Sequence, residues 1–239
     1  VDSMQKAANE IGAKIKIGAV AVEAAATESW QTTCLKTWNA GMMPGCGDKA
    51  DFYVVHNYFT PYNTNSTATQ IYQAAATVPK TMMDYVKNTL QANGCAIKPV
   101  VLDEWNMFAT GAMQQVSNVS GGFAITVLGE LLKNNYGLAT RWDLINGWQN
   151  GNDHGLFSPG DEPGVSKWSP RPSFYYLYYF QKMLGDRLVS ATTTSSLYAF
   201  ASTYSSGQLN VTIVNPGAGA ITASVKTKNF RTGNRFYWY

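Results

Sequence analysis

Two adjacent acids, Asp103 and Glu104, directly follow an apolar run at residues 100–102. Burying a carboxylate without a partner is costly, so such acids are expected where a strand ends and its side chains become accessible. There an acid can cap the next helix, pair with an arginine, or act as a nucleophile. The pattern favours chemistry over a structural role, and Glu104 is the candidate nucleophile.

His56 and Tyr58 end a second apolar run, at residues 51–59. Because alternate residues of a strand face the same side, both side chains are expected to point into the same space. A tyrosine hydroxyl beside a carboxylate would keep that carboxylate ionised and oriented. A lone histidine after an apolar strand is more often structural, but Tyr58 nearby favours a catalytic role for His56.

A third polar group begins at Trp142 and continues into a long loop at residues 149–169. Trp148 can be a core residue, but hydrogen-bond donors and acceptors follow it closely. The residues that could bind ligand hydroxyl groups are Asn146, Gln149, Asn152 and His154. Glu23, which follows another apolar run, is interpreted as a solvated loop acid.

Short apolar runs alternate with helical spacing through residues 1–185. The expected strands are 14–21, 51–59, 98–105 and 139–148, and the expected helices are 1–12, 68–92, 121–136 and 173–184. Pro79 should break or kink the second helix. Strand–helix alternation with strands this apolar predicts an α/β fold with a parallel sheet. The loops after such strands lie beside the active site in barrel enzymes.

The composition changes at about Gly185. Residues 186–239 are rich in Thr, Ser and Val, alternate apolar with polar side chains, and contain turn residues at 206–207 and 215–217. This pattern predicts four or five antiparallel strands of a β-sandwich. The run at 236–239 is strand-like but has no closing turn, so we expect the sandwich to be incomplete.

Composition narrows the classes of function. Charged residues make up 14% of the chain and the net charge is +3, which argues against a polyanion-binding protein. No apolar run is long enough to span a membrane. Aromatic residues reach 13%, which fits either a large core or a cleft that stacks on sugar rings.

The three cysteines give a prediction of their own. Cys34 and Cys46 bracket a short segment that contains Gly and Pro, and this spacing predicts a disulfide, with Cys95 left over. Such a bond would contribute about 3 kcal/mol through loop-closure entropy. Because no Cys-x-x-Cys pairing occurs, an oxidising compartment is favoured over a zinc site, and we expect a secreted or periplasmic protein.

The strand ends together resemble those of a known clan of enzymes. Residues 103–106 (Asp-Glu-Trp-Asn), preceded by residues 56–58 (His-Asn-Tyr) and followed by Trp148, resemble the retaining (β/α)8-barrel glycoside hydrolases. Residues 155–157 and 170–177 look like those of members with a C-terminal β-sandwich. Arabinofuranosidases, β-xylosidases, some endoglucanases, β-agarases and porphyranases are of that kind. General similarity leans toward the agarases and porphyranases, which hydrolyse galactans.

The resemblance implies a division of the chain and roles for its residues. Residues 1–185 would supply strands five to eight of a (β/α)8 TIM barrel, and residues 186–239 a partial β-sandwich. Glu104 would be the nucleophile, positioned by Tyr58 and His56. The residues expected to bind the sugar are Trp105, Asn106, Trp148, Asn146, Gln149, Asn152 and His154.

The clan's general acid/base, an Asn-Glu pair after the fourth strand, has no counterpart in this sequence. Half a barrel leaves two sheet edges open, so we expect the chain to be incomplete. The missing half would come from the same or another chain. No cofactor or metal is implied, and the expected partner is a polysaccharide or oligosaccharide, not nucleic acid or membrane.

Three alternatives stay open. The chain could be a non-catalytic carbohydrate-binding barrel whose acid/base was lost. It could be a hydrolase of the same clan that acts on β-glucan, xylan or arabinan. It could be a metal-dependent hydrolase using His56, Asp103 and His154, although the spacing gives no metal-ligand motif.

Overall fold

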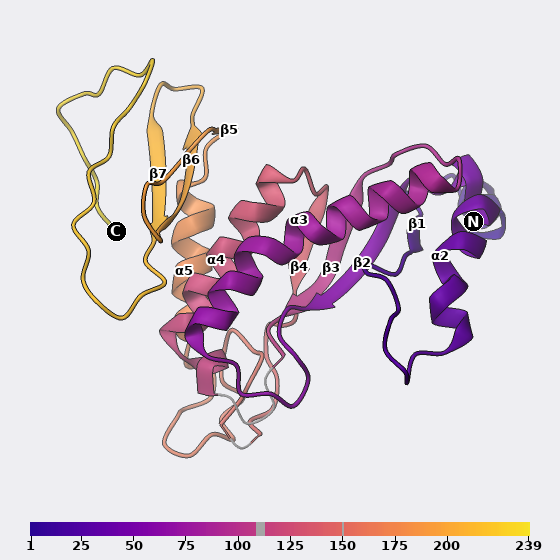
Figure 1. Cartoon of the computed structure of the whole chain (residues 1–239), viewed down its shortest axis with the longest axis horizontal. Helices are drawn as coiled ribbons and strands as arrows, with labels where there is room; N and C mark the ends of the chain where they lie inside the picture. Colours follow the sequence, from indigo (N-terminus) through magenta and orange to yellow (C-terminus); the bar gives the residue numbers. More distant parts are fainter. Residues whose placement is uncertain (109–112, 150) are drawn as a thin grey trace.

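A computed structural model describes residues 1–108, 113–149 and 151–239. Four parallel strands form its central sheet in the order β1-β2-β3-β4 (Figure 1). The strands are β1 (Gly18–Val20), β2 (Phe52–Tyr58), β3 (Val100–Asn106) and β4 (Leu138–Arg141). The predicted parallel α/β sheet is therefore confirmed.

Two of the strands are shorter than predicted. The expected strand 14–21 contains only the three residues of β1, and the expected strand 139–148 ends at Arg141. Beyond Arg141 the backbone leaves the sheet, and the carbonyl of Trp142 accepts a hydrogen bond from the side chain of Asn106. The polar residues predicted at the end of a fourth strand therefore belong to a loop.

The helices lie where the spacing predicted them, with one addition. They are α1 (Asp2–Glu10), α2 (Thr33–Cys46), α3 (Ala68–Ala92), α4 (Asn118–Lys133) and α5 (Pro172–Met183), with short 3-10 helices η1 (Gly47–Lys49) and η2 (Met113–Val116). Thr67 begins α3 with a capping box to Gln70. Pro79 does not break α3, since the helix runs on through it, packed against the core on the face that carries Met82 and Val86.

Helix α2 overturns the predicted disulfide. Cys34 and Cys46 lie twelve residues apart on this one helix, and both are free thiols. At about 1.5 Å per helical residue their Cα atoms are roughly 18 Å apart, far beyond the roughly 7 Å limit for a disulfide. Its Gly and Pro residues favour a loop, whereas the segment is helical and is tied to β1 by the Trp38 indole, which donates to the Val20 carbonyl.

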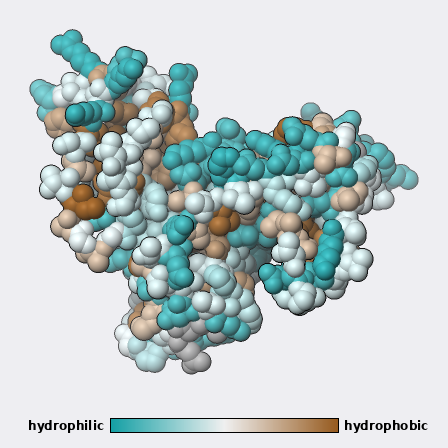
Figure 2. All heavy atoms as spheres, viewed as in Figure 1, coloured by the Kyte–Doolittle hydropathy of each residue, from teal (hydrophilic) through white to brown (hydrophobic). Residues whose placement is uncertain are grey.

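Helices α3 and α4 cover one face of the sheet and enclose the main core. Fully buried side chains from the sheet and the two helices meet there, namely Tyr53, Val55, Leu102, Trp105, Ile71, Val86, Phe123 and Val127. The outward face of α3 is hydrophilic (Figure 2), as expected of a helix that buries only one side. This layer fixes β2 and β3, the strands that carry the candidate site.

A second, antiparallel sheet follows α5. It contains three strands, β5 (Arg187–Val189), β6 (Tyr198–Thr203) and β7 (Leu209–Val214). A smaller apolar cluster joins this sheet to helices α3, α4 and α5 through Val214, Tyr72, Ile125 and Phe180. Residues 215–239 contain no strand, and Phe236 to Tyr239 are exposed, so the structure shows antiparallel β structure without the predicted β-sandwich.

Candidate active site

The segments that follow β2, β3 and β4 gather at the carboxyl edge of the sheet (Figure 1). All four strands are parallel, so their carboxyl ends meet at this edge. The site residues predicted from the sequence lie on these strand ends and on the loop after β4. We call this region the mouth: His56 and Tyr58 on β2, Asp103 and Glu104 on β3, Arg141 at the end of β4, and the described residues 142–149 and 151–154 after it.

A β-bulge in β3 turns both acids toward the mouth. Val55 pairs with Leu102, but the next residue, His56, pairs with Glu104, so Asp103 is the extra residue. The same irregularity recurs against β4, between Leu102 and Trp105. Leu102 and Trp105 both pack into the helix-covered core although three positions separate them. The bulge therefore releases the two residues between them from the core face.

Glu104 lies in the position predicted for it. The Tyr58 hydroxyl donates a hydrogen bond to Glu104 Oε1 at 2.8 Å, and His56 Nδ1 lies 3.7 Å from Glu104 Oε2. Burial, and then the hydrogen bond to the Glu104 carboxylate, raises the pKa of Tyr58. The phenol therefore stays protonated and remains a donor to Glu104. The predicted contact between Glu104 and Tyr58 or His56 is confirmed.

His56 has a second acidic neighbour. Its Nε2 lies 2.6 Å from Asp103 Oδ1, and the two side chains are 51% and 40% exposed. His56 therefore stands between Asp103 and Glu104, one ring nitrogen facing each. Asn57, which follows it, donates to Glu23 Oε1 at 3.2 Å. Glu23 does lie in a loop, as interpreted, but it is partly buried and bonded to β2 rather than fully solvated.

Charged groups at the end of β4 hold the loop that forms one side of the mouth. The Arg141 guanidinium donates to the His154 carbonyl at 2.9 Å, and burial lowers the pKa of Arg141 to about 10. Burial, and then the negative charge of Asp153, raises the pKa of Asp143 to about 6, while Arg141 opposes this shift. Burial, and then Arg141, lowers the pKa of His154, which favours its neutral form.

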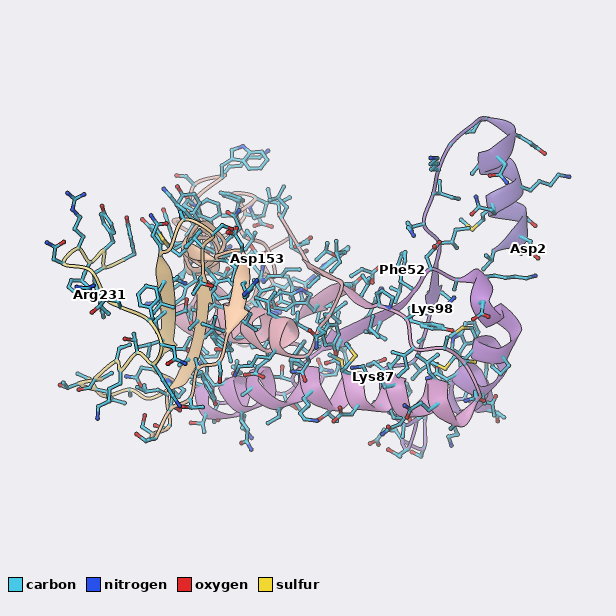
Figure 3. All side chains as sticks on the ribbon, turned by 90° about the horizontal axis from the view of Figure 1, so that it is seen from above. Asp2, Phe52, Lys87, Lys98, Asp153 and Arg231 are labelled. Carbon is cyan, nitrogen blue, oxygen red and sulfur yellow. The ribbon has the colours of Figure 1, made fainter. Side chains whose placement is uncertain are left out.

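The loop after β4 is clamped by Arg171, the residue that precedes α5. Its guanidinium pairs with buried Asp153 at 2.6 Å and also with Glu162, and it lies 5.7 Å from the centre of the Trp148 ring. Asp153 lies well away from Phe52 and Lys98, which mark the amino-terminal ends of β2 and β3 (Figure 3). The clamp therefore holds the loop at the end of the sheet where the candidate nucleophile lies.

The predictions that Trp105 and Asn106 bind sugar are wrong, because both side chains are buried. Trp105 is 1% exposed and packs its ring against Phe59 and Phe123, because the bulge returns it to the core face. Asn106 is fully buried and uses its side chain to hold the loop, donating to the Trp142 carbonyl at 2.6 Å and accepting from Met107 N–H. Both residues shape the mouth without facing it.

The remaining predicted ligand-binding residues lie on the clamped loop. The His154 ring is 5.6 Å from the Tyr58 ring, and its Nδ1 lies 3.5 Å from the Asn146 amide. Gln149 is exposed and exchanges backbone hydrogen bonds with buried Asn152. The structure brings Asn146 and His154 to the mouth, and the sugar-binding roles of these residues and of Trp148 stay predictions.

Sequence reasoning missed several residues at the mouth. Arg141 and Asp143 flank the end of β4, and a charged pair around an exposed tryptophan after an apolar run is the signal that could have found them. Tyr62, also missed, is 67% exposed, and its ring contacts Phe108, which in turn contacts Tyr58. Trp142, where the predicted polar group begins, is 44% exposed. These rings are available for stacking on a ligand.

Within the described part of the chain, no group of three or more His, Cys, Asp or Glu side chains is placed to hold a metal ion. His56 and Asp103 pair with each other, but His154 does not join them in such a group. No described helix is both long and apolar enough to cross a membrane.

Comparisons with known proteins give distant likenesses. A hyaluronoglucuronidase from Hirudo nipponia is 22% identical over 215 residues, which are 83% of this chain and 41% of that protein. The GH51 arabinofuranosidase of Xanthomonas axonopodis pv. citri superposes with a TM-score of 0.59 at 13% identity, over 87% of this chain and 45% of that one. No family model matches the chain.

Two further solved structures agree with this picture. The α-L-arabinofuranosidase of Thermotoga maritima gives a TM-score of 0.52 at 19% identity, over 84% of this chain and 43% of that one. The 4-O-α-L-rhamnosyl-β-D-glucuronidase of Fusarium oxysporum gives 0.53 at 16% identity, over 81% and 40%. The chain shares a fold with these glycosidases. It spans about two fifths of the length of the curated relative it matches.

Proposed function

We propose that this chain belongs to a retaining glycoside hydrolase in which Glu104 is the nucleophile. The observation that carries the proposal is the 2.8 Å hydrogen bond from Tyr58 to Glu104 at the carboxyl edge of a parallel sheet. Glu104 attacks the anomeric carbon and forms a glycosyl–enzyme ester, while the leaving oxygen takes a proton from an acid. Water then cleaves the ester, giving its proton back to that acid, and no cofactor takes part.

The proton-transferring acid is proposed to lie outside this sequence. Retaining enzymes hold their two carboxyl groups about 5–5.5 Å apart. Asp143 has a raised pKa, but one of its carboxylate oxygens is buried without a hydrogen-bond partner, so it is poorly placed to reach a leaving group. The relatives are about twice as long, which supports a complementary half in the same or another polypeptide.

We propose a neutral sugar polymer as substrate, a galactan of the agarose type. Three acids lie at the mouth: Asp103 beside His56, Glu104 beside Tyr58, and Asp143 beside Arg141. Arg171, which precedes α5, is held by Asp153 and Glu162. Arg141 is bonded to the His154 carbonyl and Arg171 to two acids, so neither of these two described arginines is free to bind the carboxylate of a uronic acid. The exposed rings of Tyr62 and Trp142 suit stacking on neutral sugars.

A polymer of this kind cannot enter a cell, so we propose that the enzyme is secreted or periplasmic.

β-Glucan, xylan and arabinan are neutral too and satisfy the same charge argument. The preference for a galactan rests on the general similarity of residues 56–66 and 141–157 to agarases and porphyranases.

The test is to trap the covalent intermediate in the full-length protein. An activated 2-fluoro glycoside should add one glycosyl mass to the peptide that contains Glu104, and the Glu104→Gln variant should stay unlabelled. Turnover on agarose, porphyran, xylan, arabinan, β-glucan and hyaluronan then identifies the sugar. Labelling of another residue removes Glu104 from the mechanism, and binding of a polymer without any turnover supports a non-catalytic barrel.

A further inference from the structure

The loop that follows β2 presents an aromatic ring next to the mouth. Tyr62 is 67% exposed, and residues 59–67, which connect β2 to α3, include no charged side chain. Its neighbours Asn63 and Thr64 are exposed and polar. A flat apolar face surrounded by uncharged hydroxyl and amide groups fits a neutral sugar ring better than a charged ligand.

The ring of Tyr62 is held in place by the loop that follows β3. It meets the ring of Phe108 edge to face, with ring centres 4.8 Å apart and ring planes at 89°. The buried Thr60 hydroxyl donates to the Phe108 carbonyl, so a hydrogen bond also joins the two loops. Because the ring is already ordered, a ligand that stacks on it loses little free energy in fixing this side chain.

The position of Tyr62 relative to the nucleophile follows from the rings that link them. The Phe108 ring contacts both Tyr62 and Tyr58, with its centre 4.8 Å from that of each. The Tyr58 hydroxyl in turn donates to Glu104. A sugar stacked on Tyr62 is therefore displaced from the unit whose anomeric carbon faces Glu104, and it is another unit of the same chain.

Trp142, the other exposed ring of the mouth, comes from the opposite neighbour of β3. The sheet order is β2-β3-β4, and Tyr62 follows β2 whereas Trp142 follows β4. Glu104 lies on the strand between them. A chain bound across the carboxyl edge of the sheet would pass from one ring to the other, with the nucleophile between the two.

We infer that Tyr62 is a stacking platform for a further unit of a neutral polysaccharide and makes the enzyme prefer long chains to short glycosides. The inference rests on the proposed function, because the platform serves the same site. The contact lies outside the reacting unit, so it stabilises the bound substrate and the transition state alike. Its loss should therefore raise KM for long substrates and leave kcat almost unchanged.

A surface tyrosine without a role is the competing explanation, because single exposed apolar side chains are normal in proteins. The two explanations differ in how they depend on the length of the substrate. A platform acts only on substrates that are long enough to reach it, whereas a residue needed only for folding would affect every substrate equally.

The test compares a long and a short substrate of the full-length protein. In Tyr62→Ala, kcat/KM for agarohexaose should fall about tenfold, mainly through KM, because the apolar ring face that the sugar covers is lost. The value for a nitrophenyl galactoside, which is too short to reach the platform, should stay close to that of the parent. If the protein hydrolyses another neutral polymer, the hexasaccharide and the nitrophenyl glycoside of that polymer replace these two.

Two further variants separate the ring from its hydroxyl and from general damage. Tyr62→Phe keeps the ring and should match the parent on both substrates. Tyr175→Ala removes another exposed tyrosine, 48% accessible and located on α5. It is the matched control and should also leave both values unchanged.

An unchanged kcat/KM for the hexasaccharide in Tyr62→Ala, or an equal loss on both substrates, overturns the inference. Hydrolysis of hyaluronan but of no neutral polymer also overturns it. If the full-length protein hydrolyses no glycoside, the proposed function fails, and affinity electrophoresis then tests the platform alone. In native gels that contain agarose, xylan, arabinan or β-glucan, at least one polymer should retard the parent more than Tyr62→Ala. Equal migration of the two proteins in every gel overturns the inference.

Discussion

The two sides of β3 are built from neighbouring residues but differ in their exposure and in the polarity of their surroundings. On the helix-covered side, Leu102 and Trp105 are at most 1% exposed and belong to the main hydrophobic core. On the mouth side, the side chains of Asp103 and Glu104 are 40% and 29% exposed and are bonded to polar partners. A single bulge separates the two sets.

This separation teaches how one strand serves both packing and chemistry. The core side is fixed by shape, so it tolerates loss of volume poorly. The mouth side is fixed by hydrogen bonds to groups that can change without opening a cavity. Substitutions on the core side should therefore act on stability, and those on the mouth side should act on turnover.

The largest expected effect is on the mouth side. Glu104→Gln in the full-length protein should lower kcat by more than about a thousandfold, because an amide of nearly equal volume is no nucleophile. The melting temperature should stay close to the parental value, since Gln can still accept a hydrogen bond from Tyr58. The comparison fails if the variant retains activity within about tenfold of the parent, or if it unfolds.

The next largest effect is expected on the core side of β3, where a substitution should change stability and not turnover. Leu102→Ala should lower the free energy of unfolding by about 2–5 kcal/mol, because it leaves a cavity between the sheet and α3. Denaturant unfolding measures this loss directly. The folded fraction of the variant should still show the Tyr58–Glu104 contact and turn over at a rate close to the parent. A loss well under 1 kcal/mol would show that the core side is not rigidly packed.

A smaller effect is expected from the partner of Glu104. Tyr58→Phe keeps the ring contacts with Phe108 and His154 but removes the donor to the carboxylate. A hydrogen bond to a charged group is worth about 1.5–3 kcal/mol, so kcat/KM should fall roughly 10- to 150-fold. Tyr62→Phe is the matched control, because Tyr62 lies on the same aromatic cluster without reaching Glu104. Equal losses in both variants would assign the effect to the ring cluster.

Much of the fold followed from periodicity. Strands β2 and β3 and the helices α3, α4 and α5 were predicted within a few residues, because buried strands and one-sided helices leave strong patterns. Helix α2 was missed because Gly41, Pro44 and Gly45 make a helix look like a loop, and the predicted Cys34–Cys46 disulfide failed with it. Contacts to β1 override those local preferences.

Part of the site was predicted because parallel strands bring their last residues to one edge of the sheet. The predicted strand ends therefore placed Glu104, Tyr58 and His56 together. The same strand ends put Trp105 and Asn106 in the mouth, since a bulge leaves no mark in the sequence. Arg141 and Asp143 were missed because a strand expected to end at Trp148 ends at Arg141.

The smallest effect concerns the support beneath the mouth, where Asp143 is an acid with a raised pKa of about 6 against 3.8 for the ordinary group. The folded state thus favours the protonated form, and this contribution to stability is complete below the ordinary pKa and is lost as pH rises through about 6. Asp143→Asn imitates the protonated form at every pH. Relative to that variant, the parent should lose about 1.5 kcal/mol between pH 4 and pH 7, after allowing for screening by solvent. Asp186→Asn is the control with the opposite sign, because hydrogen bonds from Ser205 lower the pKa of that exposed acid. Denaturant unfolding of the three proteins across this range measures both trends, and a parent that gains stability over Asp143→Asn as pH rises would show that Arg141 outweighs burial at Asp143.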